Sequence, residues 1–147
     1  MLDAIAIEIE FDVLASRAQV WESLVAETSQ WWKREFFATK DPDGIYLEPR
    51  PGGRLYEENA NGGLLWYTVI EIVPSEVLAM AGNLAPPYGG PATSMLRIEF
   101  SDHGAKCHVK LTDHIFGVVD DASRRAIEDG WRTLFIEGLK AHVERLN

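Results

Sequence analysis

Residues 121–146, DASRRAIEDGWRTLFIEGLKAHVERL, decide the fold, because they combine helical periodicity with a length that no other segment reaches. At about 100° per residue, one face of this helix collects nearly all of its large apolar side chains. The residues expected on or beside that face are Trp131, Leu134, Phe135, Ile136, Leu139, Val143 and Leu146. The stretch therefore predicts one long amphipathic helix, about 39 Å in length, that must pack its apolar face against another layer.

Two glycines, Gly130 and Gly138, interrupt this helix. A glycine inside a helix costs roughly 1 kcal/mol relative to alanine, so each needs a reason. The reason is either a close backbone approach or open space beneath the helix. The second alternative predicts a cavity, and hence a ligand. Gly138 lies inside the apolar arc and Gly130 at its edge, so Gly138 is the stronger indication of a cavity.

The chain upstream of the helix reads mainly as strands. Residues 5–11 alternate apolar and polar side chains, as in a half-buried strand. Ser16 and Gln19 have capping-box spacing, which predicts a helix that ends near Glu27, and a short helical turn follows at 28–32. Turn signals such as Asn61-Gly62 then separate six more strands. These strands are expected at 45–48, 54–58, 64–73, 77–81, 95–100 and 106–116.

This element order, β-α-α-β×6-α, predicts an α+β fold. A seven-stranded antiparallel sheet has one apolar face that needs a cover, and only the C-terminal helix is long enough to provide it. We therefore expect a curved sheet around that helix, with the two short helices closing one end. Residues 1–147 contain no linker or repeat and are expected to form a single domain.

Composition excludes several classes of function. The formal net charge of −9 argues against nucleic acid and anionic membranes as partners. The single cysteine, Cys107, rules out an internal disulfide and a cysteine-based zinc site. The N-terminus lacks the pattern of a signal peptide, and no apolar segment reaches 18 residues. The sequence thus favours a cytoplasmic protein.

Five short motifs carry a resemblance to a known superfamily. They are Val20-Trp21-Glu22, Trp31-Trp32, Arg50-Pro51-Gly52-Gly53-Arg54, Val69-Ile70-Glu71-Ile72-Val73-Pro74 and Gly130-Trp131. In their order and spacing the chain resembles the START / birch-pollen-allergen-like (SRPBCC) superfamily, in particular the branch related to the C-terminal domain of the heat shock protein 90 ATPase activator. The resemblance implies a helix-grip fold with a cavity, between sheet and helix, that often holds an apolar small molecule. It does not imply one reaction, because the superfamily includes lipid carriers, hormone receptors and polyketide cyclases.

Aromatic and aliphatic side chains of several elements would line such a cavity. Ligand pockets are mostly apolar with a few polar groups, although the same side chains equally suit a packed core. The expected ligand-binding residues are Trp31, Trp32, Phe36, Leu55, Trp66, Met80, Leu96, Leu111, Asp113, Trp131, Phe135 and Gly138. The loop at 82–93 is either a gate, with Leu84 and Tyr88 dipping inward, or a plain connection between strands.

Two carboxylates are candidates for catalysis. Alternation along the last strand places Asp113 inward, between Leu111 and Ile115. A buried carboxylate needs a partner or a raised pKa, so Asp113 is either an acid–base group or a structural carboxylate bonded to backbone or an arginine. Glu57 is a second candidate, and the two acids could work as a pair, unless Glu57 is simply solvated.

The histidines give no metal motif. His108 and His114 share a strand face but lie about 20 Å apart at strand rise, and no HExxH spacing exists. We expect no metal and no cofactor, and we expect Cys107 to be buried and inert.

Three functions remain open at this point. The first is binding of an apolar or amphipathic small molecule. The second is an enzyme of the cyclase, dehydratase or hydrolase type that uses Asp113, alone or with Glu57 or a tyrosine. The third is an interaction module that regulates a chaperone ATPase; it ranks last because the sequence begins directly at the first strand, whereas the co-chaperone has an additional N-terminal domain. A homodimer is an open possibility.

Overall fold

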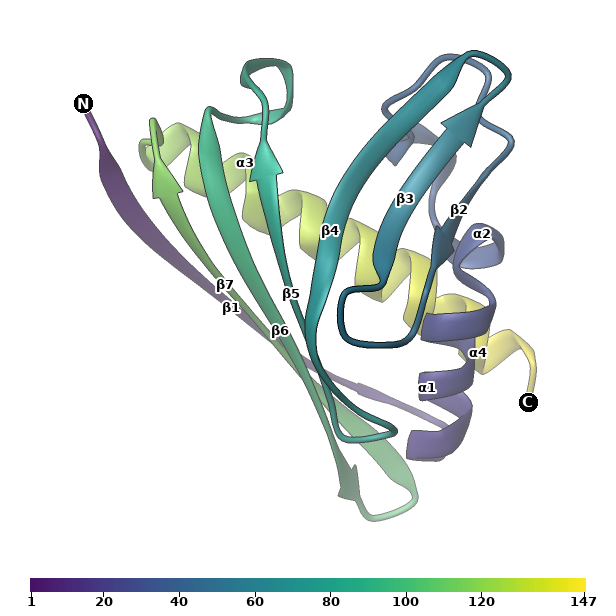
Figure 1. Cartoon of the computed structure of the whole chain (residues 1–147). Helices are drawn as coiled ribbons and strands as arrows, with labels where there is room; N and C mark the ends of the chain where they lie inside the picture. Colours follow the sequence, from purple (N-terminus) through teal and green to yellow (C-terminus); the bar gives the residue numbers. More distant parts are fainter.

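A seven-stranded antiparallel sheet curves around the C-terminal helix in the computed structural model, which describes residues 1–147 (Figure 1). The strands are β1 (Asp3–Val13), β2 (Gly44–Leu47), β3 (Arg54–Asn59), β4 (Gly62–Val73), β5 (Val77–Leu84), β6 (Ala92–His103) and β7 (Lys106–Gly117). Their order in the sheet is β1-β7-β6-β5-β4-β3-β2. The six later strands therefore form a meander, and the N-terminal strand adds to its β7 edge. The predicted α+β helix-grip architecture is confirmed.

Bulges help the sheet to bend. The register shifts between Leu55 and Tyr56 in the β3–β4 pair, and again between Val69 and Glu71 in the β4–β5 pair. An extra residue on one strand increases local twist and bends the strand. The long strands can therefore wrap around the helix, whose ribbon crosses the inside of the curve (Figure 1).

Strand alternation sets the inner face as the sequence predicts. In β7, Cys107, Val109, Leu111, Asp113 and Ile115 are all at most 1% exposed. The residues between them, such as His108 and His114, are more accessible to solvent. The inner face of the sheet belongs to one continuous core that also includes the helices.

Two short helices close one end of the sheet, as expected. Helix α1 (Arg17–Ala26) begins at the predicted capping box, in which Ser16 and Gln19 bond each other's backbone reciprocally. Helix α2 (Thr28–Trp31) follows at once and is joined to α1 by a 2.8 Å hydrogen bond from Nε1 of Trp31 to the carbonyl of Ser23. A 3₁₀ turn, η1 (Arg34–Phe36), then leads toward β2.

The C-terminal helix is continuous but not uniform. It comprises α3 (Asp121–Arg132), the π-helical segment η3 (Thr133–Lys140) and α4 (Ala141–Arg145). The side chain of Asp120 caps its N-terminus by accepting from the Ser123 amide. The apolar face is buried as predicted except at Ile136, which is half-buried, and at Leu146, which is 60% exposed because it lies beyond the end of the helix. No helix has the length and apolar character of a membrane span.

The loop between β5 and β6 is shorter than expected. The predicted loop began at Gly82 and ended at Thr93, but Gly82 pairs with Ser94 and Leu84 with Ala92, so the strand ladder continues. What remains is a tight connection around the 3₁₀ turn η2 (Pro86–Tyr88).

Candidate functional site

A cavity of about 180 Å³ lies between the sheet and α3. Ten of its twelve lining residues are hydrophobic. The lining consists of Trp32, Phe36, Trp66, Tyr67, Leu84, Tyr88, Asp113, Ala126, Ile127, Gly130, Trp131 and Leu134. Such a surface suits an apolar occupant, and its few polar groups can fix the orientation of that occupant.

Three cavity-lining side chains, Tyr67, Asp113 and Trp131, form one buried polar cluster with Ser94. Ser94 donates a 2.6 Å hydrogen bond to Oδ1 of Asp113, and Nε1 of Trp131 donates one of 2.8 Å to Oδ2. The hydroxyls of Tyr67 and Ser94 are 2.7 Å apart. Strands β4, β6 and β7 and helix α3 therefore meet at a single carboxyl group. Of the two structural partners considered for Asp113, neither backbone nor arginine is present, and side-chain donors take their place.

Burial controls the acidity of this cluster. Asp113 is 1% exposed and forms no salt bridge, so loss of solvation raises its pKa, against the lowering effect of the bonds from Ser94 and Trp131. Burial also raises the pKa of Tyr67, and the nearby Asp113 charge adds to that rise. A carboxyl group of this kind can hold a proton at a higher pH than an ordinary aspartate can.

Glu57 has a different task. Its carboxylate accepts bonds of 3.0 Å from the Ala38 amide, 2.6 Å from the Thr39 amide and hydroxyl, and 2.8 Å from Nε1 of Trp66. Burial by itself would raise its pKa, but these donors together lower it. Glu57 thus holds the segment before β2 onto the sheet. It does not line the cavity, so the structure does not bring it together with Asp113 as a catalytic pair.

The predicted cavity residues other than Gly138 divide into two groups. Trp32, Phe36, Trp66, Asp113 and Trp131 line the cavity. The others pack more deeply, where only about 10 Å³ of free space remains or none, because their side chains interdigitate. This second group comprises Trp31, Leu55, Met80, Leu96, Leu111 and Phe135.

Of the two helix glycines, Gly130 lies at the cavity, whereas Gly138, the stronger indication of a cavity in the sequence, does not. A Cβ on Gly138 would lie 2.7 Å from the carbonyl oxygen of Trp31, so this glycine permits close approach of α2 and does not roof a cavity. Gly130 does line the cavity, and a Cβ there would find its nearest neighbour, Cε1 of Phe36, at 3.5 Å. The absence of a side chain at Gly130 therefore leaves room in the cavity.

Several lining residues were not singled out from the sequence. Tyr67 lines the cavity, and Ser94 is hydrogen-bonded to it without lining the cavity. Both were missed, although both occupy inward positions of their strands. Leu84 and Tyr88, considered as parts of a gate, both line the cavity, Leu84 from the last position of β5 and Tyr88 from the turn η2. Tyr88 is 40% exposed and lies at the boundary between cavity and solvent.

One buried donor near this site has no partner. Nε1 of Trp32 is shielded from solvent and lacks an acceptor, whereas the indoles of Trp31, Trp66 and Trp131 each donate a hydrogen bond. Leaving such a group unpaired carries a desolvation cost of about 1–3 kcal/mol.

Metal-binding side chains gather away from the cavity. Asp113 is the only lining residue of a ligating type, which is too few for a metal centre. On the outer face of β1 and β7, however, His108 lies beside Asp12 and His103. The distance between His108 and His114 along one strand does not reveal this group, because its members come from three strands.

Comparison with known proteins identifies the fold. No protein-family model matches the sequence, and no curated protein does. Among solved structures, the Mll3558 protein from Rhizobium loti is similar with a TM-score of 0.74 at 20% identity, over 96% of this chain and 98% of that one. The Aha1 dimer from Colwellia psychrerythraea matches with a TM-score of 0.69 at 16% identity, over 95% and 96%. Ara h 8.0201 matches with a TM-score of 0.70 at 9% identity, over 96% and 98%. At such identities the likeness concerns the fold.

Proposed function

Given a helix-grip fold of the START / birch-pollen-allergen-like type, we propose that this chain binds a small apolar or amphipathic molecule between its sheet and C-terminal helix. The observation that carries the proposal is a mostly apolar cavity with one buried polar cluster on its wall. The apolar lining favours burial of a hydrophobic body at about 25 cal/mol per Å² of apolar surface. The Asp113–Ser94–Tyr67 cluster provides a place for one hydroxyl or similar polar group.

The volume limits the ligand that enters without rearrangement. The cavity measures about 180 Å³, and an engineered apolar cavity of about 150 Å³ is known to admit benzene. A single aromatic ring or a short branched chain is therefore the expected size. A longer molecule would have to displace Leu84, at the end of β5, and Tyr88, in the turn η2.

Toluene and phenol test this proposal, because they share a size and differ in one hydroxyl. Each is titrated into ¹⁵N-labelled protein, and amide shifts are followed by NMR. We expect saturable shifts around α3 and β7, with phenol the tighter ligand because its hydroxyl can reach the polar cluster. Gly130→Leu should fill the cavity and abolish binding, whereas Ala122→Leu, exposed on the same helix, should not. Failure of both probes to bind, or unchanged binding by Gly130→Leu, would overturn the proposal.

The alternative is catalysis at the same site. The raised pKa of Asp113, caused first by burial, suits a group that exchanges a proton with a bound ligand. The partner would be the Tyr67–Ser94 pair rather than Glu57, whose carboxylate is occupied by donors of its own. Asp113→Asn separates the alternatives: an enzyme would lose turnover of its substrate while still binding toluene, and a pure binding protein would show no turnover to lose.

A further inference from the structure

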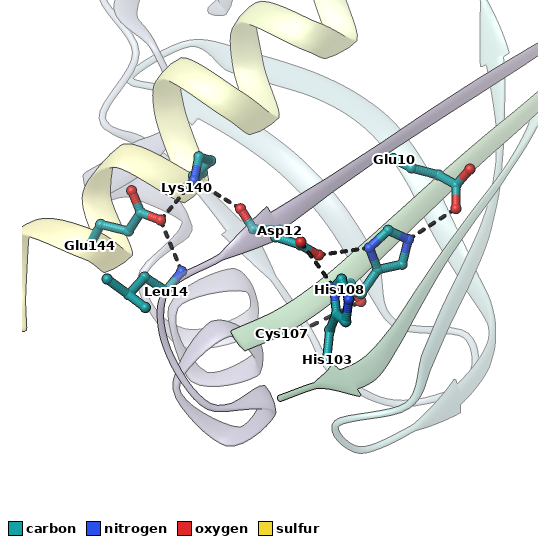
Figure 2. Close-up of polar contacts among 8 residues, drawn as sticks. All are labelled: Glu10, Asp12, Leu14, His103, Cys107, His108, Lys140 and Glu144. Carbon is teal, nitrogen blue, oxygen red and sulfur yellow. Dashed lines mark hydrogen bonds and ion pairs between the residues drawn. The ribbon is translucent and has the colours of Figure 1, made fainter. Parts of the chain in front are cut away.

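A second cluster of polar side chains lies on the outer, convex face of the sheet. Nδ1 of His103 is 3.0 Å from Oδ2 of Asp12, and Nδ1 of His108 is 2.8 Å from Oδ1 of the same carboxylate (Figure 2). The three potential ligand atoms all lie within 4.8 Å of one another. Figure 2 shows the two imidazoles converging on Asp12 from β6 and β7, while Asp12 comes from β1.

The strands hold this cluster in place. Asp12 pairs directly with His108 across the β1–β7 ladder, and His103 ends β6 beside the turn into β7. Lys140, from the C-terminal helix, donates a 2.8 Å bond to the backbone carbonyl of Asp12 (Figure 2). Lys140 also bonds Glu144 at 2.7 Å, and Glu144 accepts from the Leu14 amide at 2.9 Å. The end of β1 is therefore anchored while its Asp12 carboxylate faces the histidines.

The donor set selects a class of ion. Two imidazole nitrogens and one carboxylate oxygen suit Zn²⁺ and its first-row neighbours, whereas Mg²⁺ and Ca²⁺ prefer oxygen ligands alone. In a tetrahedral zinc site with Zn–N distances of about 2.0–2.1 Å, ligand atoms lie about 3.3 Å apart. The two Asp12–histidine separations, 2.8 and 3.0 Å, run to different oxygens of the carboxylate and are close to this spacing. His103, whose side chain is 68% exposed, is free to rotate toward His108 so that both imidazoles and one Asp12 oxygen can surround an ion. Cys107 does not contribute, because its thiol is buried on the opposite face and burial raises its pKa to about 11.

We propose that Asp12, His103 and His108 bind a divalent transition-metal ion, for which Zn²⁺ is the best-suited probe, with water in the fourth position. Glu10 supports this assignment independently. Its Oε1 lies 2.9 Å from Nε2 of His108, so His108 can donate its Nε2–H to Glu10 while Nδ1 holds the metal. A carboxylate in this outer position fixes the tautomer of a ligating histidine and increases its basicity. The charges also balance, since Asp12 and Glu10 together neutralise a divalent cation.

Isothermal titration of tag-free protein with ZnCl₂ at pH 7.5 tests the proposal. We expect one Zn²⁺ per chain and no binding of Mg²⁺. Loss of a ligand in His108→Gln, His103→Gln or Asp12→Asn should weaken Zn²⁺ binding by at least about 100-fold, and loss of the outer carboxylate in Glu10→Gln by about 10–100-fold. His114→Gln is the matched control, because His114 is exposed on the same face of β7 and lies outside the cluster.

An NMR measurement on the unaltered protein keeps the proposal falsifiable if a variant fails to fold. In ¹⁵N-detected spectra of the imidazoles, Zn²⁺ should shift Nδ1 of both His103 and His108 and leave His114 unchanged. Two results would overturn the proposal and show that these residues form only an ion-pair cluster. One is the lack of stoichiometric Zn²⁺ binding, and the other is Zn²⁺ binding that His114→Gln weakens as much as His108→Gln does.

Discussion

Nε1 of Trp131, on the C-terminal helix, donates a 2.8 Å hydrogen bond to Oδ2 of Asp113, on the inner face of β7. This bond ties the helix to the sheet at the polar end of the cavity. It also supplies one of the two donors that a carboxyl group with almost no solvent contact requires. The same contact therefore serves both the stability of the fold and the shape of the candidate site.

Removal of the Nε1–H donor of Trp131 should lower the stability of the folded protein. Trp131→Phe keeps an aromatic ring but leaves Oδ2 of Asp113 unpaired, which predicts a loss of about 1–3 kcal/mol in the free energy of unfolding. Urea denaturation followed by circular dichroism measures it. Trp32→Phe is the control, because it shrinks a cavity-lining indole whose Nε1 has no partner. Equal losses in the two variants would contradict a special role for the Trp131 bond.

Asp113 should make stability decrease with rising pH. Its pKa in the folded chain is raised above the ordinary value of 3.8, mainly by burial. The folded state thus holds the proton more tightly than the unfolded state, and this contribution is complete below pH 3.8 and is lost as the pH rises through the folded-state pKa. Asp113→Asn cannot ionise, so its stability relative to the natural chain should improve over that window. Urea midpoints from pH 4 to pH 8 give the difference, and a difference independent of pH would contradict the prediction.

Glu57 should show the opposite dependence. Burial by itself would raise the pKa of Glu57, but the hydrogen bonds from Ala38, Thr39 and Trp66 outweigh this effect and lower the pKa below 4.5. Its contribution is therefore present above pH 4.5 and is lost as the pH falls through the lower folded-state pKa. Glu57→Gln should cost about 1–3 kcal/mol at pH 7 and progressively less in acid. Hydrogen exchange should locate the change at the amides of Ala38 and Thr39; unaltered protection there would show that Glu57 does not anchor the segment.

The sequence predicted the features that depend on local periodicity. Alternation along residues 106–116 placed Asp113 on the buried face, and the Ser16–Gln19 spacing located the start of α1. It did not predict features that depend on strand register. The Asp12–His108 contact exists because β1 pairs with β7, nearly a hundred positions later in the chain, and nothing in either strand alone indicates that pairing. The Tyr67–Ser94 contact between β4 and β6 was missed for the same reason.

The helix glycines show a further limit of prediction from sequence. Periodicity predicts the helix face on which a residue lies, but not how much free space lies opposite that residue. Gly130→Ala and Gly138→Ala test the structural explanation directly. At Gly130 the new methyl would meet Phe36 at an ordinary 3.5 Å, so the gain in helix propensity should stabilise the protein by up to about 1 kcal/mol. At Gly138 the methyl would lie 2.7 Å from the backbone oxygen of Trp31, which cannot rotate away, and the strain should destabilise the protein by about 1–3 kcal/mol. Thermal and urea unfolding of both variants measure these changes. If Gly138→Ala were as stable as the natural chain, α2 would lie farther from the C-terminal helix than it does in the structure. Free space beneath Gly138, the alternative that the sequence suggested, would then become the better explanation of this glycine.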